Sequence, residues 1–398
     1  MRIAINAMVL GPRDTGVGTW LRDLIRALAR VDRENEYVIY HRPRAGAIAP
    51  EAPGRFCFVP VRLPGAGPAA RIAWERLMLP RRVRRDGAHV LHCPAYICPR
   101  SGVPTVVTLH DLFVYSRPAV CRRRNVLHFR LLLPGTMRHA AVLHCTSQWV
   151  RDCLRATFPR ADARAVVVPP GVDPAFGPPD PQQAERCRRE IGAETPPFLF
   201  VGSPEPKKNV GLLLAAFAEL IRRRGRGRKL VLAGPPGWRS ERLERRIAEL
   251  GLTGDVVRRG YVPRRELPLL YGASLALVFP SQSEGFGLPP LEAMACGLPV
   301  ITSGRGGLAE CVGDAALLVE DLTADALADA MERVETDEEL RRRLSQKGRE
   351  RARRFDADEA ALRMIELYTA AARTPGPQVK AEAVRTDTTT WMAAEGQP

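Results

Sequence analysis

Two glutamates and the glycine-rich segment between them are the residues of this sequence best suited to chemistry. Glu284 and Glu292 are separated by seven residues, and Gly285 and Gly287 lie between them. Glycine permits a tight loop in which backbone N–H groups face a ligand. Carboxylates repel phosphate but accept hydrogen bonds from hydroxyl groups. This stretch therefore suits a ligand that carries both phosphate and hydroxyl groups, such as a nucleotide sugar.

The elements that must position this loop are a strand and a helix. The apolar run 275–279 predicts a buried strand that leads into the loop. Pro289 and Pro290 suit the first turn of a helix, where a missing N–H costs little, and Gly297 is placed to end that helix. Because unpaired amides and the helix dipole favour phosphate, we expect the amides of residues 285–288 to bind the phosphates of a ligand.

This stretch resembles the signature of the family 4 glycosyltransferases, which are retaining enzymes of the GT-B fold. The signature stands here as Glu284-Gly285-Phe286-Gly287-Leu288-Pro289-Pro290-Leu291-Glu292. Together with the string Glu205-Pro206-Lys207-Lys208-Asn209, it looks most like the mannosyltransferase branch of the family. The alternative is a structural loop between a strand and a helix, and the motifs described below favour the functional interpretation.

Length and periodicity predict an α/β protein of two domains. The chain has 398 residues, more than a single hydrophobic core usually serves. Short apolar runs alternate with helical periods in both halves, which indicates open parallel sheets with ligands at the carboxyl ends of the strands. The resemblance implies the GT-B fold, in which two Rossmann-like domains face a central cleft. The predicted strands are 3–7, 37–40, 56–60, 89–92, 105–109, 142–145, 165–168, 198–201, 230–233, 255–258, 275–279 and 300–302.

The segment Pro169-Pro170-Gly171-Val172-Asp173 marks the domain boundary, because successive prolines disfavour helix and glycine lets the chain turn. It resembles the linker of the family. We expect an acceptor domain at 1–170 and a nucleotide-sugar domain at 171–356. A last helix at 357–373 crosses back onto the first domain in GT-B proteins, and 374–398 is expected to be a disordered tail because it is short of apolar residues.

Two threonines are expected to cap helices. Thr19 precedes apolar residues at helical spacing in the first half, and Thr336 with Glu339 forms a capping-box pattern for a late helix. Asp356 and Asp358 form an Asp-x-Asp pair, the motif that holds a divalent ion in glycosyltransferases of the other main fold. Because this pair lies where the last helix should begin, we interpret it as a helix cap and expect no metal ion.

Two lysines supply the positive charge that a diphosphate needs. Lys207 and Lys208 precede a predicted helix, where the helix dipole disfavours lysine, so their position indicates another role. The family holds the donor diphosphate with a cationic residue at a strand exit and a lysine about five residues later. Ser203 occupies the first of these positions and Lys208 the second. Lys207 is open to two interpretations, diphosphate binding or a surface lysine.

The first half contributes a histidine and a glycine loop. Thr108-Leu109-His110-Asp111-Leu112 resembles a Thr-x-His-Asp-Leu motif whose histidine points at the donor sugar in the family. Gly16 and Gly18 lie in a loop that contacts acceptor or donor phosphate in the family, the alternative being a flexible turn. His89 and His92 with Cys93 suggest zinc, but strand alternation places the two histidines on opposite faces, which favours structural roles.

The resemblance implies a role for each of these residues. Glu284 binds donor-sugar hydroxyls, Glu292 binds the ribose, and a turn at 259–262 lies beside the nucleobase. Transfer proceeds by attack on the face that the leaving phosphate occupies, with that phosphate as the base. The predicted catalytic residues are His110, Glu284 and Lys208. The predicted donor-binding residues are Gly16, Gly18, Ser203, Lys207, Gly285, Phe286, Gly287, Leu288, Glu292, Tyr261 and Val262, with no metal and no cofactor besides the donor.

Composition constrains the partners. Sixty Lys and Arg against 44 Asp and Glu leave a net charge of +16, while only 6% of residues are aromatic, so stacking on nucleic acid is not expected. Arginine runs at 81–85 and 122–124 adjoin apolar stretches. They suit an anionic membrane, a nascent polysaccharide or a polyprenyl-diphosphate-linked sugar, with solvated arginines as the alternative. Nine scattered cysteines and the lack of a signal sequence predict a cytoplasmic protein, with peripheral contact to the inner face of the membrane as a further expectation.

Three functions are compatible with these features. The favoured one is a retaining transferase that moves a hexose, preferably mannose from GDP-mannose, to a glycan or lipid-linked acceptor in cell-surface polysaccharide synthesis. The second is a GT-B epimerase or hydrolase of nucleotide sugars. The third is a non-catalytic basic protein that binds membrane or nucleic acid, and the intact Glu284, Glu292, Lys208 and His110 argue against it.

Overall fold

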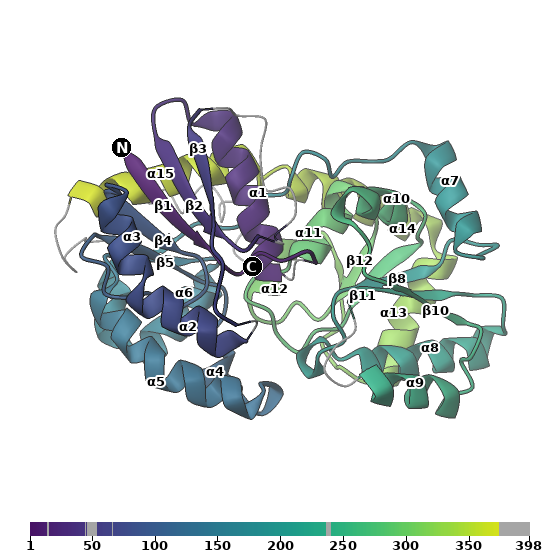
Figure 1. Ribbon diagram of the computed structural model, residues 1–398. Helices are drawn as coiled ribbons and strands as arrows, with labels where there is room; N and C mark the ends of the chain where they lie inside the picture. The colour runs from purple at the N-terminus through teal and green to yellow at the C-terminus, as the bar shows by residue number, and fades with distance from the viewer. Residues whose placement is uncertain (14–15, 44, 46–53, 66, 236–239, 374–398) are drawn as a thin grey trace. The chain divides into compact units, whose positions relative to one another are not determined.

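The computed structural model of the protein describes residues 1–13, 16–43, 45, 54–65, 67–235 and 240–373. The chain forms two compact units, each a parallel sheet packed with helices (Figure 1). The first unit comprises Met1–Gly171 and the chain from Asp356 on, and the second comprises Val172–Phe355. The two Rossmann-like α/β domains expected from the sequence are confirmed. The tail expected at 374–398 lies outside the described residues.

The sheet of the first unit has seven parallel strands in the order β3-β2-β1-β4-β5-β6-β7. Chain connections run outward from β1 toward one edge and from β4 toward the other, so β1 and β4 flank the topological switch point, where open α/β sheets bind ligands. Buried side chains fill both faces of the central strands β4, β5 and β6, whereas the edge strand β3 is only partly buried. The strands are β1 (Arg2–Ala7), β2 (Glu36–His41), β3 (Phe56–Pro60), β4 (Val90–Cys93), β5 (Thr105–Leu109), β6 (Val142–Cys145) and β7 (Ala165–Val167).

The helices of the first unit include the last described segment of the chain. The final helix, α15 (Ala357–Arg373), packs against α1 (Gly16–Val31), and Arg30 pairs with Asp358 at 2.5 Å. The expectation that Thr19 caps α1 is wrong, because the helix already begins at Gly16 and Thr19 lies in its first turn. The remaining helices are α2 (Pro68–Leu77), α3 (Leu79–Arg85), α4 (Phe113–Ser116), η1 (Pro118–Val120), α5 (Arg123–His139), α6 (Gln148–Thr157) and η2 (Pro159–Arg164).

The sheet of the second unit has six parallel strands in the order β10-β9-β8-β11-β12-β13. Its switch point lies between β8 and β11, so the loops that follow these two strands are placed to share a ligand. The strands are β8 (Phe198–Val201), β9 (Leu230–Ala233), β10 (Val256–Gly260), β11 (Ala276–Phe279), β12 (Val300–Thr302) and β13 (Leu317–Leu318).

The helices of the second unit confirm most expected elements and correct one cap. Thr336 ends α13, and its hydroxyl donates to the carbonyl of Glu332. Asp337 caps the next helix by accepting from the Leu340 amide at 2.8 Å, so the capping box expected at Thr336 is wrong. An aspartate one residue later is the better cap because its carboxylate also favours the helix dipole. The helices are α7 (Pro181–Glu190), η3 (Pro206–Lys208), α8 (Val210–Arg224), α9 (Ser240–Glu249), η4 (Arg264–Glu266), α10 (Leu267–Gly272), α11 (Leu288–Ala295), α12 (Gly307–Val312), α13 (Ala324–Thr336) and α14 (Glu338–Ala352). Within the described ranges, no helix combines the length and the apolar character needed to cross a bilayer.

Candidate active site

The glutamate loop connects β11 to α11 at the switch point of the second sheet. Gly287, with φ of 126°, forms the N-cap of α11, and Pro289 and Pro290 occupy its first turn as expected. This backbone conformation favours glycine, and a Cβ here would also lie 2.6 Å from Leu308 Cδ2, so that side chain would have to move. Gly297, with φ of 78°, follows the C-cap of the helix. The helix start predicted from the sequence is therefore present, with Leu288 as its first residue.

A second loop, residues 303–307, clamps the glutamate loop through backbone contacts. The amide of Gly307 donates to the carbonyl of Glu284 at 2.8 Å. A Cβ on Gly307 would lie 2.2 Å from the Gly285 carbonyl oxygen, which no side chain could tolerate. Ser303 Oγ donates to the Ser281 carbonyl at 2.6 Å. The clamp fixes the backbone of the loop that carries Glu284. No local sequence pattern predicted it.

Glu284 is a buried carboxylate held between two lysines. Its Oε2 lies 3.1 Å from Lys207 Nζ, and its Oε1 lies 3.3 Å from Lys208 Nζ. Ser281 Oγ donates to Oε1 at 3.0 Å. Burial alone would raise the pKa of Glu284, but the two ammonium groups and the hydrogen bonds lower it to about 2. Glu284 is therefore ionised throughout the physiological range although it is only 9% exposed.

The lysines reach Glu284 because of how the β8–α8 connection is built. Both lie in the 3-10 turn η3, which Asn209 ends in the left-handed conformation with φ of 56°. Lys208 Nζ lies 4.5 Å from the centroid of the Phe279 ring, a cation–π contact. Gly202 has no side chain to fill the space beside it, and a Cβ there would lie 3.1 Å from Lys208 Nζ. Ser203 follows Gly202 at the exit of β8.

Glu292 is anchored by two residues that sequence reasoning missed. It projects from α11 and is 3% exposed. Arg264 Nη1 donates to its Oε1 at 2.6 Å, and Tyr271 O–H donates to its Oε2 at 2.9 Å. Burial and the neighbouring carboxylate raise the pKa of Tyr271 well above its usual value, so its phenol stays a donor. Arg264 also lies 4.5 Å from the centroid of the Phe176 ring. These contacts fix Glu292 in one orientation.

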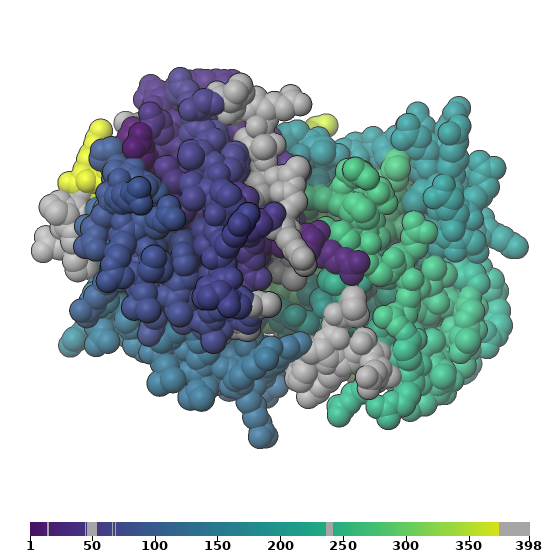
Figure 2. Space-filling view, in the orientation of Figure 1, coloured from purple at the N-terminus to yellow at the C-terminus, as the bar shows by residue number. Residues whose placement is uncertain are grey.

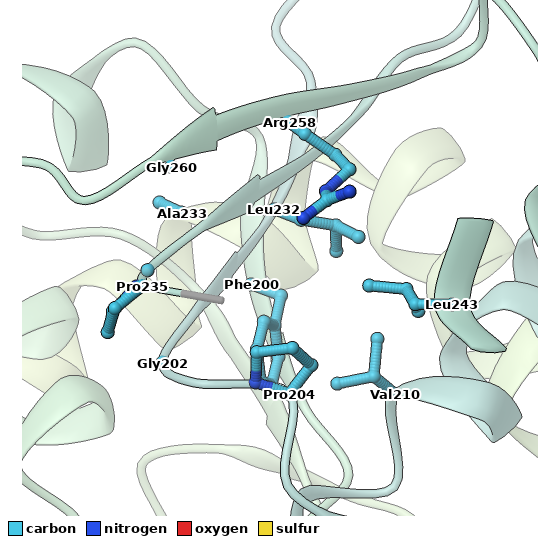
Figure 3. A pocket seen from close by; sticks show the side chains of 11 residues that line it. Phe200, Gly202, Pro204, Val210, Leu232, Ala233, Pro235, Leu243, Arg258 and Gly260 are labelled. Atoms are coloured by element: carbon cyan, nitrogen blue, oxygen red, sulfur yellow. The ribbon is translucent and has the colours of Figure 1, made fainter. Parts of the chain in front are cut away.

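The turn after β10 borders a small hollow at the carboxyl ends of β8, β9 and β10. The hollow measures about 20 Å³, roughly the space of one water molecule. Gly260 and Gly202 line it, whereas the predicted nucleobase contacts Tyr261 and Val262 follow Gly260 and do not line it. Figure 3 shows the side chains of Val210, Leu232 and Leu243 directed toward it. The hollow as it stands is too small for a base.

In the first unit, His110 follows β5 and is half-buried against aromatic rings. Its Nε2 lies 2.9 Å from the Pro94 carbonyl oxygen, and because a carbonyl only accepts, Nε2 carries the hydrogen. The Trp20 ring meets His110 edge-on at 5.0 Å between centroids, and Tyr96 does so at 5.9 Å. The orientation of the His110 ring is therefore fixed from three sides.

A chain of hydrogen bonds crosses the buried core behind His110. It connects Tyr368 O–H to His92 Nδ1 (2.9 Å), His92 Nε2 to Thr108 Oγ1 (2.8 Å), Thr108 Oγ1 to His144 Nδ1 (3.0 Å) and His144 Nε2 to the Val168 carbonyl (2.8 Å). Since the last acceptor is a carbonyl, every hydrogen in the chain must point away from Tyr368. Burial lowers the pKa of His144 to about 4 and that of His92 well below its usual value, so both rings stay neutral.

Trp20 connects this chain of hydrogen bonds to His110. Its ring stacks on His144 with a centroid distance of 5.6 Å and meets His92 edge-on at 6.0 Å. The C-terminal helix α15 thus contributes Tyr368 to a network that supports His110. The predicted strand 89–92 begins one residue later, at Val90, so His89 precedes β4 and is exposed, accepting from the Arg2 amide, whereas His92 lies within the strand and is fully buried.

The remaining predicted residues divide between the units. Gly16 and Gly18 lie in the first turn of α1, where Gly16 is exposed and a Cβ on it would meet nothing within 4 Å. They belong to the first unit with His110, whereas the other predicted site residues belong to the second unit. The structure brings together Lys207, Lys208 and Glu284 directly, with residues 285–288 continuing the same loop.

The Asp-x-Asp pair serves as a cap, as interpreted from the sequence. Asp356 Oδ1 accepts from the amides of Asp358 and Glu359, each at 2.8 Å, at the start of α15. Among the described residues, no three His, Cys, Asp or Glu side chains are grouped as a metal site would require. The nine cysteines are free thiols.

The chain matches glycosyltransferase families over most of its length. Residues 15–176 match the family described as Glycosyltransferase Family 4, and residues 182–351 match Glycosyl transferases group 1. A D-inositol 3-phosphate glycosyltransferase of Frankia alni is 32% identical over 394 residues, which cover 89% of this chain and 94% of the relative. The O-antigen chain mannosyltransferase B of Escherichia coli is 28% identical over 298 residues, covering 74% and 78% respectively.

Solved structures agree on the fold. WaaG, a glycosyltransferase involved in lipopolysaccharide biosynthesis, superposes with a TM-score of 0.77 at 19% identity, covering 92% of this chain and 99% of WaaG. Sucrose-phosphate synthase from Thermosynechococcus elongatus gives a TM-score of 0.73 at 25% identity, covering 93% and 98%. One of these relatives is named a mannosyltransferase, whereas the name of the other gives no transferred sugar, so together they single out no mannosyltransferase branch. The chain belongs to the family 4 glycosyltransferases and is a glycosyltransferase of the GT-B fold.

Proposed function

We propose that this enzyme transfers a hexose, with retention of configuration and without a metal ion, from a nucleotide-diphosphate sugar to a glycan or lipid-linked acceptor. The observation that carries the proposal is the buried Glu284 between Lys207 and Lys208, beside the N-terminus of α11. A diphosphate needs cations and amide donors, and a sugar needs hydrogen-bond acceptors. The switch point of the second sheet offers both within one loop system.

Donor binding exchanges partners within this cluster. Each lysine ammonium has three donors, so Lys207 and Lys208 can contact diphosphate oxygens and still neutralise Glu284. Glu284 stays ionised, because its pKa is about 2, and accepts hydrogen bonds from the hydroxyls of the donor sugar. Glu292, already oriented by Arg264 and Tyr271, accepts from the ribose. The remaining donor contacts are proposed for Ser203, Tyr261, Val262, Gly16 and Gly18.

The reaction requires stabilisation of the leaving diphosphate. The bond between the anomeric carbon and the phosphate oxygen breaks, and the acceptor oxygen bonds to the anomeric carbon on the same face. The proton of the acceptor hydroxyl passes to the leaving phosphate oxygen. Lys208 and the amides of residues 285–288 stabilise the charge that develops there, which is the part a metal plays in other transferases. His110 is the catalytic residue proposed from the first unit.

The sugar and the acceptor are proposed from chemistry and similarity. Mannose from GDP-mannose is favoured by the two sequence strings of the second unit and by similarity to a mannosyltransferase. Leu77, Leu127 and Leu131, each more than 60% exposed, lie on helices rich in arginine. Such a surface suits peripheral contact with an anionic inner membrane that carries a polyprenyl-diphosphate-linked glycan for cell-surface polysaccharide. Nucleic acid is not proposed as a partner.

Calorimetry separates this proposal from its alternatives. The protein is titrated with GDP-mannose, UDP-glucose and UDP-N-acetylglucosamine, each with and without a chelator. We expect one donor to bind with the same affinity in both conditions and to turn over only slowly without acceptor. Rapid turnover without acceptor would indicate an epimerase or hydrolase. Loss of binding in chelator would contradict the metal-free site, and salt-sensitive DNA binding without donor affinity would contradict the transferase.

A further inference from the structure

The two carboxylate oxygens of Glu284 have different kinds of partner. Oε1 accepts a hydrogen bond from Ser281 Oγ at 3.0 Å and lies 3.3 Å from Lys208 Nζ, whereas Oε2 lies 3.1 Å from Lys207 Nζ. Ser281 is fully buried, so a ligand does not reach its hydroxyl. The side chains of Lys207 and Lys208 are 19% and 15% exposed. A ligand can therefore compete for the lysines but not for the serine.

The backbone around Ser281 is held by neighbouring loops. Ser303 Oγ donates to the Ser281 carbonyl at 2.6 Å. The amide of Gln282 donates to the carbonyl of Lys207 at 2.8 Å, which ties the loop that carries Glu284 to the 3-10 turn η3 that carries both lysines. Because both backbones are held in this way, a change of partner at the carboxylate requires only that side chains rotate.

Lys208 is confined beside Oε1 by contacts along its side chain. Its Nζ lies 4.5 Å from the centroid of the Phe279 ring. A Cβ on Gly202 would lie 3.1 Å from Nζ and 3.3 Å from Cδ and Cε, so the glycine leaves the room that the lysine side chain occupies. Ser281 and Lys208 thus both act on Oε1. Oε2 is therefore the oxygen whose partner, Lys207, can be exchanged.

The use of lysine at this site is unusual for the chain. Only five of its 60 basic residues are lysines, and two of the five contact Glu284. A guanidinium binds a carboxylate through two parallel N–H bonds in a rigid fork, whereas an ammonium is a compact charge with three rotatable donors. The other buried carboxylate of the site, Glu292, is held by Arg264 instead. Lysine suits a carboxylate whose partners change, and arginine suits one that stays in place.

We propose that Ser281 is a positioning residue, which holds Glu284 Oε1 while the donor diphosphate draws Lys207 away from Oε2. Oε2 then accepts a hydrogen bond from a hydroxyl of the donor sugar. Lys208 stays beside the carboxylate, so the exchange leaves no buried charge unpaired. The inference rests on the transferase function proposed above. It adds an order of events, in which the diphosphate binds before the sugar hydroxyl is recognised.

Turnover without an acceptor tests the role of Ser281. The probes are GDP-mannose with GDP and UDP-glucose with UDP, and the pair that the unaltered protein binds is used. Ser281→Ala should lower kcat for the slow release of nucleoside diphosphate about tenfold, because a hydrogen bond to a charged group is lost. The affinity of this variant for the nucleoside diphosphate alone should not change. Loss of that affinity with an unchanged kcat would contradict the proposal.

Ser101→Ala is the matched control. Ser101 is a buried serine of the first unit, and its hydroxyl donates to the Val103 carbonyl at 2.8 Å. It is not one of the residues of the candidate site, so kcat and nucleotide affinity should both remain. Equal effects of Ser101→Ala and Ser281→Ala would show that Ser281 only stabilises the fold.

A double-variant cycle shows whether Ser281 acts through Glu284. The ratio of the affinities for the nucleotide sugar and for the nucleoside diphosphate reports the contact with the sugar. Ser281→Ala should lower this ratio several-fold in the otherwise unaltered protein and should have no further effect in Glu284→Gln. An equal reduction in both backgrounds would contradict the proposal, because a residue that only supports the fold would act independently of the carboxylate.

Nitrogen NMR of the lysine ammonium groups tests the exchange at Oε2, since a chain with five lysines gives few signals. GDP or UDP alone should shift the signal of Lys207, which is identified by its absence in Lys207→Met. The signal of Lys229, which is bonded to the Gly254 carbonyl on the exposed surface, should stay in place. A Lys207 signal that bound nucleoside diphosphate leaves unchanged would contradict the exchange.

Lys207→Met should also weaken binding of the nucleoside diphosphate several-fold, because one of its cations is lost. Arg186→Met is the matched control, because Arg186 is exposed on α7. In Figure 2 the teal atoms of α7 lie on the visible surface of the second unit. Equal losses in the two variants would show that Lys207 contributes only to the overall charge of the protein.

A substitute variant and the unaltered protein separate the possible failures. If circular dichroism shows that Ser281→Ala does not fold, Ser281→Cys replaces it, and a several-fold loss of kcat is again expected because a thiol is a weaker donor than a hydroxyl. If the unaltered protein binds none of the nucleotide sugars, the transferase function itself is refuted. Normal binding and turnover in Ser281→Ala would refute only the role of this serine.

Discussion

The two units surround their candidate catalytic residues with opposite kinds of polar interaction. In the first unit, the hydrogen-bond chain from Tyr368 through His92 and His144 carries no net charge and runs in a single direction. In the second unit, Glu284 is ionised and neutralised by Lys207 and Lys208. Burial is comparable, but it keeps the histidines neutral, whereas the lysines keep the buried carboxylate charged.

We infer different roles for the two networks from this difference: the first holds side chains in position, and the second exchanges its contacts with a ligand. A chain in which each donor has one acceptor stores a fixed geometry, because reversing any member leaves a buried group unpaired. An ion-paired cluster can instead transfer its contacts to an incoming anion or hydroxyl without creating an uncompensated charge. We therefore expect changes in the first network to affect stability and alignment. Changes in the second cluster should affect ligand binding and turnover.

The largest effect is expected from Glu284→Ala. Transfer should fall by at least about a hundredfold, because the hydroxyls of the donor sugar lose their acceptor. Nucleotide affinity should stay the same or increase, since Lys207 and Lys208 lose the carboxylate that neutralises them. Steady-state kinetics and calorimetry measure the two quantities. Glu190→Ala, at an exposed position of α7, is the control. Unaltered transfer rates in the Glu284 variant would refute the site.

A smaller loss is expected from Lys208→Ala. Removing one charge-assisted contact to the diphosphate should lower kcat/KM for the donor by about ten- to a hundredfold. Lys207 remains to keep Glu284 partly neutralised, so the fold should persist. Lys229→Ala, which removes a lysine bonded to the Gly254 carbonyl on the exposed surface, is the control. Equal kinetics in the two variants would show that Lys208 is only a surface residue.

Short sequence motifs predicted much of the cluster of Glu284, Lys207 and Lys208. They predicted few of the hydrogen bonds between distant residues that hold the two networks in place. Gly287 and the two prolines after it predicted the start of α11, because the residues that favour a turn and a helix start are neighbours in the sequence. The bond between Arg264 and Glu292 joins residues 28 positions apart, and the bond between Tyr368 and His92 joins residues 276 positions apart. Periodicity carries no signal for such pairs, since they depend on how separate elements pack.

The helix caps show that even a short sequence pattern can leave two neighbouring residues as candidates. Thr336 and Asp337 both have side chains that can cap a helix, and only the end of α13 decides between them. The close contact of Gly307 with Gly285 could likewise not be predicted from the sequence, because it depends on how two separate loops approach each other. His89 and His92 do differ in exposure, but His89 lies before β4 begins, so the pleat of the strand is not what separates them.

The comparison also predicts that the two networks lower the free energy of unfolding in two separate acidic pH ranges. His144 has a pKa of about 4 in the folded protein and about 6.5 when unfolded, so the unfolded chain binds the extra proton between these values. The free energy of unfolding should therefore fall as pH drops from about 6.5 toward 4, by at most about 1.4 kcal/mol per pH unit for each such histidine. Glu284, with a folded pKa of about 2, contributes its loss only below about pH 4.5.

Urea unfolding at a series of pH values between 7 and 5 measures this dependence. Glu284→Gln should leave the slope in this range unchanged, because Glu284 is ionised in both states there. His144→Gln should flatten the slope, although the variant is less stable at every pH. A slope that survives the loss of His144 and also the loss of His92 would contradict the neutral-histidine interpretation.

The smallest effect is expected from Tyr368→Phe, which removes one hydroxyl and leaves the shape of the core unchanged. His92 Nδ1 then loses its donor, and a buried unsatisfied acceptor costs about 1–3 kcal/mol. Thermal unfolding of the first unit should shift down, and kcat should fall modestly because Trp20, which packs on His92 and His144, no longer holds His110 as firmly. The KM for the donor should change little, since Lys207 and Lys208, the two cations proposed to bind its diphosphate, lie in the second unit, whereas Tyr368 lies in the first. Nitrogen NMR of the histidine rings shows which ring nitrogen carries the hydrogen. A substitution that only lowered stability would leave that position unchanged. The unaltered protein should show the hydrogen on Nε2 in both His92 and His144, and the variant should lose that preference at His92. A raised KM with an unchanged kcat would show that Tyr368 acts on donor binding and not on the alignment of His110.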